Sequence, residues 1–190
     1  MRLAAFMLVL GLAPSAPSTH PAQATPVTEN AVFAGGCYWG VEAVFEHVRG
    51  VSGAVSGFSE GVESVEVRFD PSIVSYRELL EVFFTIAHDP TSRDRQGPDV
   101  GPQYRAIVFH REAQRGEAEA YLDGLRASER FQQPIVTELR PFRAFTPAPP
   151  GQQDYVARHP SAPYVVINDL PKLERLRQQF PQLYVVRDHH

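Results

Sequence analysis

Apolar runs and amphipathic stretches alternate along the chain, and their periods predict strands and helices in turn. The apolar run "NAVFA" (residues 30–34) ends at two glycines, which predicts a buried strand. Residues 37–48 then repeat apolar side chains at spacings of three and four, as in an amphipathic helix. Residues 51–58 and 63–70 alternate well enough to predict two further strands.

A capping box opens the next predicted helix. Ser75 is followed three positions later by Glu78, and apolar residues then continue on one face until the chain reaches Asp89. A long polar loop (residues 91–103) separates this helix from "YRAIVFH" (104–110), whose composition is typical of a strand. This half of the chain therefore predicts a helix, a loop and a strand.

The last part of the chain predicts two helices and one more strand. Residues 112–130 are rich in Ala, Glu, Arg and Leu and predict a mostly exposed helix, and "IVTEL" (135–139) predicts a strand. The proline-rich residues 141–164 predict a loop with one helical turn near Asp154. "PKLERLRQQF" (171–180) then begins with a proline, as helices often do.

The order of these elements mixes hairpins with crossovers. Such an order favours an α+β fold over a doubly wound parallel sheet. We expect a single domain built as a two-layer α/β sandwich with a mixed, ferredoxin-like sheet.

The first 24 residues resemble an export signal. Arg2 gives a short positive region, an apolar stretch too short to span a bilayer follows, and "AQA" ends the segment at Ala24. We expect cleavage there, which assigns 1–24 to a signal peptide and 25–190 to the folded domain. The exported protein would be periplasmic or secreted, with no membrane association after cleavage; the alternatives are a retained anchor and a disordered tail.

Charge argues against a nucleic-acid partner. The chain has 18 Lys and Arg against 22 Asp and Glu, and removal of the signal peptide takes away only Arg2, so the net charge becomes 17 − 22 = −5. Nucleic-acid binding usually needs a basic surface. The seven His residues lack the spacing of a metal site, although His189-His190 gives a weak hint of one.

The chain has one cysteine, Cys37, which follows two glycines where a strand is predicted to give way to a helix. The free N–H groups of a helix start favour a thiolate, so Cys37 is either a reactive thiol or a small buried apolar residue. The adjacent Tyr38 and Trp39 point to different sides of a helix, so one can pack in the core while the other lines a pocket beside the sulfur.

Several stretches together resemble the type A family of peptide methionine sulfoxide reductases. The resemblance runs from about Ala31 to Tyr184, and the combination of the Cys37 motif with the central loop makes it specific. The stretches are "GGCYWGVEAVF", "VESVEVRFDP", "SYRELLEVFF", "HDPTSRDRQGPDVGPQYRAIVF" and "HPSAPYVVINDLPKLERLRQQFPQLY".

This resemblance implies a catalytic pair. Cys37 takes the position of the nucleophile, whose low-pKa, accessible thiolate attacks the sulfur of a methionine S-sulfoxide and becomes a sulfenic acid. Glu63 takes the position of the acid that protonates the sulfoxide oxygen. Without the resemblance, Glu63 would be read as a solvent-facing residue of a strand.

Four further residues match the family's substrate site. The resemblance implies that Tyr38, in place of the commoner Phe, and Trp39 form an apolar pocket for the S-methyl group. It implies that Asp99 and Tyr104 hold the oxygen or a water beside it. His88 and the following Asp are read as structural residues of a turn.

Three departures from the family pattern stand out. Between Phe58 and Glu63 the family has a longer segment with a Tyr and a His, where this chain has only "SEGV". The family's acidic-Tyr-His-Gln stretch is replaced by "PPGQQDY". No second cysteine follows Cys37, so the sulfenic acid has no internal partner.

The resemblance therefore implies a monomeric enzyme for protein repair under oxidative stress. It uses no cofactor, and a thioredoxin-like protein or another external thiol returns Cys37 to its reduced form. Its substrates are oxidised proteins or peptides, together with free methionine S-sulfoxide. Two alternatives stay open: an impaired module that binds sulfoxide peptides without turnover, and a different thiol enzyme such as a peroxide scavenger.

Overall fold

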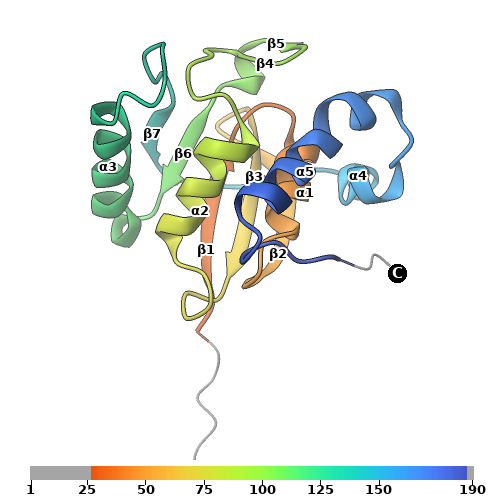
Figure 1. The fold of residues 1–190 in the computed structure, drawn as a ribbon, viewed down its shortest axis with the longest axis horizontal. Coiled ribbons are helices and arrows are strands. Elements are labelled where there is room, and N and C mark those ends of the chain that lie inside the picture. Colours follow the sequence, from red (N-terminus) through yellow and green to blue (C-terminus); the bar gives the residue numbers. More distant parts are fainter. Residues whose placement is uncertain (1–26, 188–190) are drawn as a thin grey trace, which may run out of the picture.

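A mixed six-stranded sheet forms the centre of the computed structural model, which describes residues 27–187 (Figure 1). The strands run in the order β7-β6-β1-β3-β2-β8, in which β6 and β7 are parallel and the other neighbours antiparallel. Their bounds are β1 Glu29–Ala34, β2 Val51–Ser59, β3 Val62–Phe69, β6 Ile107–His110, β7 Glu138–Pro141 and β8 Thr146–Pro147. The separate hairpin consists of β4 Arg95–Gln96 and β5 Asp99–Val100. The proposed signal peptide lies outside the described residues.

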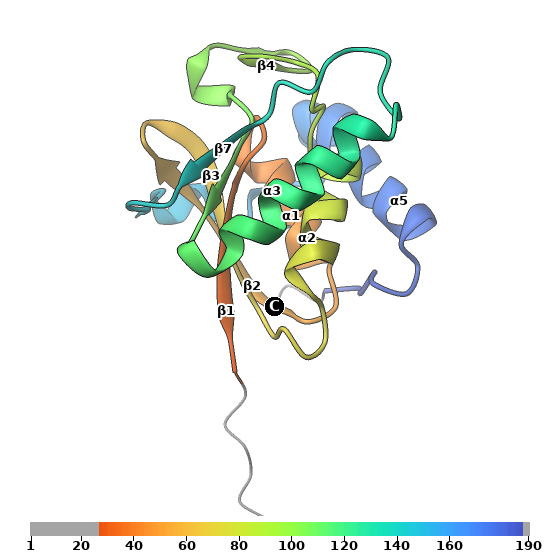
Figure 2. The same ribbon diagram turned by 90° about the vertical axis from the view of Figure 1, so that its left-hand side faces the viewer.

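Several helices lie on one side of this sheet. Figure 2 shows α2, α3 and α5 on the same side of the strands. The α-helices are α1 Tyr38–Glu46, α2 Tyr76–Val82, α3 Glu112–Ala127, α4 Tyr155–Arg158 and α5 Leu170–Gln179. The π-helical turns are η1 Phe83–Ala87 and η4 Val165–Asp169, and the 3-10 turns are η2 Pro102–Tyr104 and η3 Pro150–Gln152. None of the helices in the described part of the chain has the length and hydrophobicity that a membrane span needs.

The capping box predicted at Ser75 is confirmed. The Ser75 hydroxyl accepts a hydrogen bond from the Glu78 N–H (3.2 Å), and the Glu78 carboxylate accepts one from the Ser75 N–H (2.8 Å). These bonds satisfy backbone donors that the first turn of a helix leaves free. The start of α2 is therefore fixed by local sequence.

The core forms around Phe33 of β1. Its ring is fully buried and stacks on Phe45 of α1 and on Phe83 of η1, with both centroid distances 4.9 Å. Burying a Phe side chain of this kind stabilises a fold by about 1.5–3 kcal/mol. The aromatic cluster fixes the end of β1 and hence the turn that follows it.

The turn between β1 and α1 needs both of its glycines. Gly36 has a φ of +91°, and a Cβ there would lie 2.5 Å from the Cβ of Gln96. A Cβ on Gly35 would lie 2.8 Å from the ring of Phe83. The chain can therefore pass tightly between its neighbours before Cys37.

The β2–β3 hairpin closes in a tight turn. Strand pairing continues up to Ser59 and Val62, and the turn residues Glu60 and Gly61 have φ values of 51° and 77°. Two positive φ angles in succession are typical of the turns that match strand twist. The segment that is short relative to the family pattern is thus a compact hairpin end.

The prediction of a strand over 135–139 was wrong about where the strand begins, because β7 begins at Glu138. The Val136 N–H donates to the loop after η1 (N···O 2.8 Å), and the Thr137 hydroxyl lies 2.9 Å from Nε2 of His88. These bonds take the preceding residues out of the strand ladder. They also support the structural reading of His88.

Other boundaries differ in smaller ways. The polar loop expected at 91–103 contains the β4–β5 hairpin, and the helix expected over 112–130 ends at Ala127. The strand expected over 104–110 begins only at Ile107, after η2. Short elements of two or three residues carry too little periodicity to be read from sequence.

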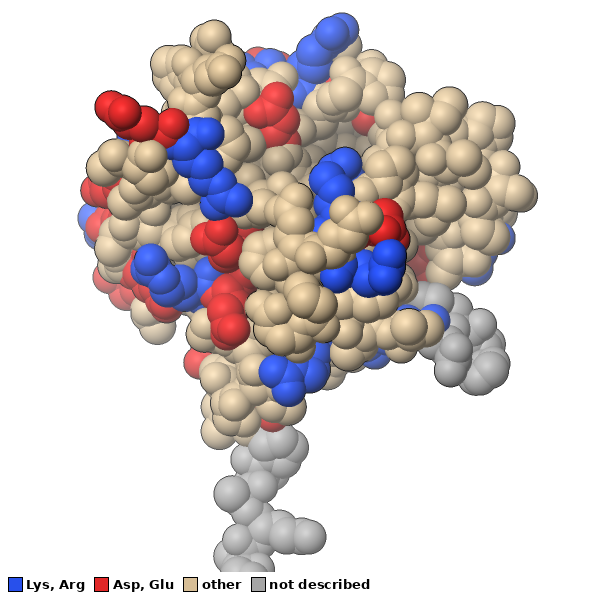
Figure 3. All heavy atoms as spheres, viewed as in Figure 1, with Lys and Arg blue, Asp and Glu red and all other residues tan. Residues whose placement is uncertain are grey.

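Charges of both signs share the surface. On the face shown in Figure 3, Lys and Arg side chains are interspersed with Asp and Glu. This face offers no broad basic surface of the kind that nucleic acids bind.

Candidate active site

Cys37 is the N-cap residue of α1, and it is 8% exposed. The backbone N–H of Trp39 donates a hydrogen bond to its sulfur. This N–H belongs to the first turn of the helix, where backbone donors have no partner within the helix. The sulfur thus lies where a helix presents free donors to a thiolate or to an anionic oxygen.

Burial outweighs this helix-end effect on the thiol. Loss of water is the largest cause that raises the pKa of Cys37 from 9.0 to about 12, and the charges of Glu63 and Asp169 act in the same direction. The Trp39 N–H and the Tyr164 hydroxyl oppose the shift. The expected low-pKa, accessible thiol is wrong for this resting site, where Cys37 is a protonated and mostly buried thiol at neutral pH.

Glu63 reaches the start of α1 from β3. Its Oε2 accepts a hydrogen bond from the Tyr38 N–H at 3.1 Å, one position from Cys37. Burial raises the pKa of the half-buried Glu63 carboxyl, and the charge of Asp99 adds to that effect. A carboxyl with a raised pKa retains its proton closer to neutral pH, so Glu63 can donate a proton to an oxygen bound beside it.

Tyr38 is the more deeply buried of the two aromatic residues after Cys37. Its side chain is 8% exposed, and its ring meets the ring of Phe58 edge-on at a centroid distance of 5.7 Å. Phe58 is the residue that pairs with Glu63 across the hairpin. Tyr38 therefore joins the helix start to the strands that carry the carboxyl.

Trp39 is half-buried and held on three sides. Its ring stacks on Tyr155 at 3.8 Å with an angle of 9° between the planes, and it meets Tyr164 edge-on at 5.8 Å. Its Nε1–H donates to Oε1 of Gln152 at 3.1 Å. The "PPGQQDY" stretch, read as a departure from the family, thus supplies two of the groups that fix the tryptophan.

Asp99 and Tyr164 are hydrogen-bonded, with the Tyr164 hydroxyl as the donor. Burial and this bond raise the pKa of Tyr164. Burial also raises the pKa of Tyr104, and the charges of Glu63, Asp99 and Cys37 add to that shift. Tyr164 was missed from sequence, because a single tyrosine in a proline-rich loop gives no signal of where it packs.

The predicted site residues converge. The six come from the helix start, from β3, from β5 and from η2, and electrostatic effects or ring contacts link each of them to another member of the set. They are Cys37, Tyr38, Trp39, Glu63, Asp99 and Tyr104.

Asp169 is a second group that sequence did not reveal. Its side chain is 1% exposed, neither oxygen has a hydrogen-bond partner among the described residues, and Nζ of Lys172 lies 3.6 Å from Oδ1. Burial raises the pKa of Asp169 to about 6 against the opposing charge of Lys172. Gly40 makes room for this carboxylate, because a Cβ there would lie 2.2 Å from Oδ1.

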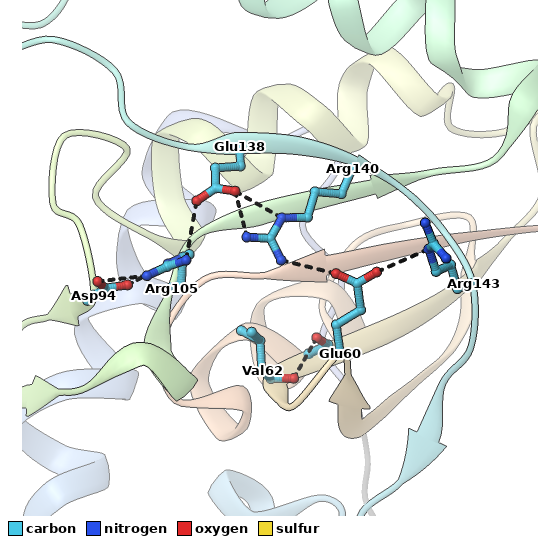
Figure 4. A network of polar contacts seen from close by, with 8 residues as sticks. Glu60, Val62, Asp94, Arg105, Glu138, Arg140 and Arg143 are labelled. Atoms are coloured by element: carbon cyan, nitrogen blue, oxygen red, sulfur yellow. Dashed lines mark hydrogen bonds and ion pairs between the residues drawn. The ribbon is translucent and has the colours of Figure 1, made fainter.

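A chain of ion pairs borders the elements that carry Glu63 and Asp99 (Figure 4). Its N···O distances are between 2.6 and 3.7 Å, and it connects the loop before β4 through β7 to the turn of the β2–β3 hairpin. Partly exposed pairs contribute at most about 1 kcal/mol each, so their effect lies in tying these segments together. In order, the members are Asp94, Arg105, Glu138, Arg140, Glu60 and Arg143.

Among residues 27–187, no three His, Cys, Asp or Glu side chains are grouped so that they could hold a metal ion. His189-His190 lies outside the described residues.

Comparison with known proteins gives consistent results. The sequence model of the family described as peptide methionine sulfoxide reductase matches residues 29–64 and 60–184, two segments that meet at the β2–β3 turn. Peptide methionine sulfoxide reductase MsrA 2 of Mesorhizobium japonicum is 44% identical over 180 residues, covering 85% of this chain and 92% of the relative. The protein of the same name from Synechocystis is 47% identical over 171 residues, covering 80% of each. Among solved structures, methionine sulfoxide reductase A of Corynebacterium diphtheriae superposes with a TM-score of 0.61 at 29% identity, covering 77% of this chain and 84% of that one.

Proposed function

The chain belongs to the peptide methionine sulfoxide reductase family, whose members reduce methionine S-sulfoxide to methionine, and from that premise we propose that Cys37 performs this reduction through a sulfenic acid. One observation carries the proposal. The Glu63 carboxylate bonds the Tyr38 N–H at 3.1 Å, directly beside the thiol at the helix start. A nucleophile and a proton donor therefore face the same small region.

The proposed step balances with a neutral thiol. The Cys37 sulfur bonds to the sulfoxide sulfur, and the S–O bond of the substrate breaks as its oxygen moves to the Cys37 sulfur. The S–S bond then breaks with its electron pair on the methionine sulfur. The products are methionine and a Cys37 sulfenic acid. The sulfoxide sulfur gains two electrons and the cysteine sulfur loses two, and the one proton of the thiol is balanced by the one proton of the sulfenic acid hydroxyl.

Glu63 is proposed as the proton donor. Oxygen is a poor leaving group from the sulfoxide unless it is protonated, and a carboxyl whose pKa is raised by burial is suited to deliver that proton. The high pKa of the Cys37 thiol is compatible with this order of events. Protonation of the substrate oxygen makes its sulfur more electrophilic, and the proton that leaves the Cys37 thiol restores the Glu63 carboxyl.

Trp39 and Tyr38 are proposed to bind the S-methyl group. The half-buried ring of Trp39 offers an apolar surface beside the sulfur, and Tyr38 closes the inner end. Asp99 and Tyr104 are proposed to hold the sulfoxide oxygen or the water that accompanies it, and the bond from Tyr164 orients Asp99.

An external thiol is proposed to complete the cycle. Cys37 is the only cysteine of the chain, so its sulfenic acid must react with a thiol from another molecule. Two such thiols restore Cys37, release water and leave as a disulfide. Members of this family take electrons from thioredoxin-type donors without a bound cofactor, and we assign that kind of partner to this protein.

We also infer that the enzyme is exported and that it acts as a monomer. The signal-like pattern of residues 1–24 supports cleavage after Ala24 and a periplasmic or secreted enzyme that repairs oxidised exported proteins.

For the fold, the strand order β6-β1-β3-β2 and the helices between these strands support a ferredoxin-like two-layer interpretation.

A binding module without turnover is the second candidate. The compact β2–β3 turn and the protonated thiol favour it. The turn lacks the Tyr and His of the family pattern, and a protonated thiol is a weaker nucleophile than a thiolate. A single-turnover assay separates the two. Reduced protein is mixed with methionine S-sulfoxide, and free thiol and methionine are counted.

Turnover predicts one methionine released for each Cys37 thiol lost, with no peroxide needed. A Cys37→Ser variant serves as the control and should release none, because a hydroxyl is a far weaker nucleophile at neutral pH. Binding of the sulfoxide without methionine release would establish the module. Thiol loss only with peroxide would establish a peroxide-consuming enzyme.

A further inference from the structure

Glu42, on α1, is a buried carboxylate with no part in the proposed reaction. Its side chain is 1% exposed. Oε1 accepts a hydrogen bond from the backbone N–H of Ser56 in β2, and Oε2 accepts one from that of Asp154, both at 3.1 Å. A carboxylate is costly to bury, and two backbone donors offset that cost only while all three segments stay in place.

The segment that Glu42 bonds is residues 148–155, here named the Trp39 loop. Gln153 ties this loop to β2 a second time: its Oε1 accepts from the Ser56 N–H, and its Nε2 donates to the Ser56 and Ala148 carbonyls, each at 2.9 Å. Asp154 has a φ of 51°, a left-handed conformation that persists only where surrounding contacts hold it. The loop is therefore held through Glu42 and Gln153.

The same loop holds Trp39. Gln152 accepts the indole N–H at 3.1 Å, and the Tyr155 ring lies parallel to the indole at 3.8 Å. These two residues flank Gln153 and Asp154 in sequence. A shift of the loop would therefore move both groups that fix the indole.

We propose that Glu42 is a positioning residue that fixes the Trp39 ring, and with it the methyl pocket, by bonding the Trp39 loop to α1. The substrate part of this inference rests on the proposed function of Trp39 as a wall for the S-methyl group. The mechanical part, that Glu42 holds Trp39 through the loop, stands on the hydrogen bonds alone.

Glu42→Gln tests the proposal. The amide keeps the size of the side chain and one acceptor, but its NH₂ group faces a backbone N–H, so one of the two bonds is lost. We expect the KM for methionine S-sulfoxide, measured with dithiothreitol as reductant, to rise about tenfold while kcat changes less than about threefold.

Trp39 also supplies a direct optical readout, because it is the only tryptophan of the chain. Acrylamide should reach the indole ring more easily in Glu42→Gln and therefore quench its fluorescence more strongly. The same is expected in Gln152→Ala, which removes the acceptor of the indole N–H. In the double variant, KM should rise by less than the product of the two single fold-increases, because both substitutions act on one loop. Glu117→Gln, on the exposed face of α3, is the matched control and should leave KM and quenching unchanged.

An unchanged KM with unchanged quenching in a folded Glu42→Gln protein would overturn the proposal. So would a fall in kcat at constant KM, which would place Glu42 in the chemical or reductant step. If the Gln variant does not fold, Glu42→Asp, which keeps the carboxyl group but withdraws both oxygens by one methylene, is judged by the same two readouts.

The quenching measurement keeps this inference separate from the proposed function. Should the wild-type protein release no methionine, the proposed function fails, and quenching alone still decides whether Glu42 holds Trp39. Should the wild type turn over while the variants match it in both readouts, only the role of Glu42 fails.

Discussion

The carboxylate of Glu63 accepts a hydrogen bond from the backbone N–H of Tyr38, 25 residues away in sequence, at 3.1 Å. This bond brings a strand residue to the first turn of the helix that Cys37 caps. It uses a helix-start donor to hold the carboxyl, and Glu63 can reach it because its strand pairs next to β1, which leads into that helix.

Glu63→Gln should separate catalysis from thiol reactivity. The amide cannot give a proton to the sulfoxide oxygen, so we expect the single-turnover rate to fall by about two to four orders of magnitude. Removal of the negative charge lowers the pKa of Cys37, so alkylation of the thiol by iodoacetamide should become faster in the same variant. Glu66→Gln, on the same strand and paired with Arg111, is the control. A less than fivefold loss of turnover would make Glu63 a structural residue.

The pH dependence of alkylation should report the buried state of Cys37. Because burial raises the thiol pKa to about 12, the alkylation rate of the resting enzyme should keep rising up to at least about pH 10 without a plateau. Asp169→Asn removes a charge that also raises this pKa, and should speed alkylation at about pH 8 by about two- to tenfold. A plateau near neutral pH would show that the thiol is already ionised.

Gly40→Ala should destabilise the protein although the position is helical. In an open helix this change stabilises by about 0.5–1 kcal/mol. Here the new Cβ would lie 2.2 Å from Oδ1 of Asp169 and 2.7 Å from Nζ of Lys172, so we expect a net loss of about 1–3 kcal/mol in the free energy of unfolding. Gly116→Ala in α3, where a Cβ meets nothing within 4 Å, is the matched control and should stabilise. Equal changes in the free energy of unfolding for Gly40→Ala and Gly116→Ala, measured in denaturant titrations, would show that α5 moves to accommodate the new Cβ at position 40.

Stability should fall on the alkaline side because of Glu46. Burial raises its pKa to about 8, with the charge of Glu42 and a bond to Asp154 acting in the same direction and Arg187 opposing. The folded protein therefore binds this proton more tightly than the unfolded chain. The stabilisation is complete below the unfolded pKa of about 4.5 and is lost as pH rises towards about 8.

Glu46→Gln should therefore reduce the difference between the free energies of unfolding at about pH 6 and about pH 8.5. The difference should not vanish, since burial also raises the pKa of Glu42 to about 7. A variant with the same pH profile as the wild type would show that Glu46 titrates normally.

Purified enzyme without a reductant should stop after one methionine per protein. Dithiothreitol should restart it, and a dimedone-type trap should label Cys37 and block the restart. Steady turnover without added thiol would contradict the one-cysteine cycle.

Local sequence predicted the parts of this structure that local interactions determine. The capping box at Ser75, the strand before Gly35 and the helix start at Cys37 follow from residues a few positions apart, and each was found. The catalytic and pocket roles of Cys37, Glu63 and Trp39 came from a resemblance to a family, and they stay predictions until the variants are measured.

What sequence missed depends on packing between distant segments. Tyr164 bonds Asp99 across 65 positions, and Glu42 bonds Asp154 across 112. Neither contact leaves a period or a motif in the sequence. The state of the thiol was misjudged for the same reason: a helix start is readable from sequence, but the burial that reverses its effect comes from the surrounding chain.

The 8% exposure of Cys37 has a further consequence in the interval between turnovers. In the proposed cycle, the Cys37 sulfenic acid reacts with a thiol of another molecule, and before that reaction peroxide can oxidise it further to sulfinic acid, which inactivates the enzyme. A sulfur that presents so little surface is a small target for such damage. The burial that raises the pKa of the thiol thus also protects the sulfur from overoxidation. This protection matters for an enzyme that depends on a second molecule in every proposed cycle.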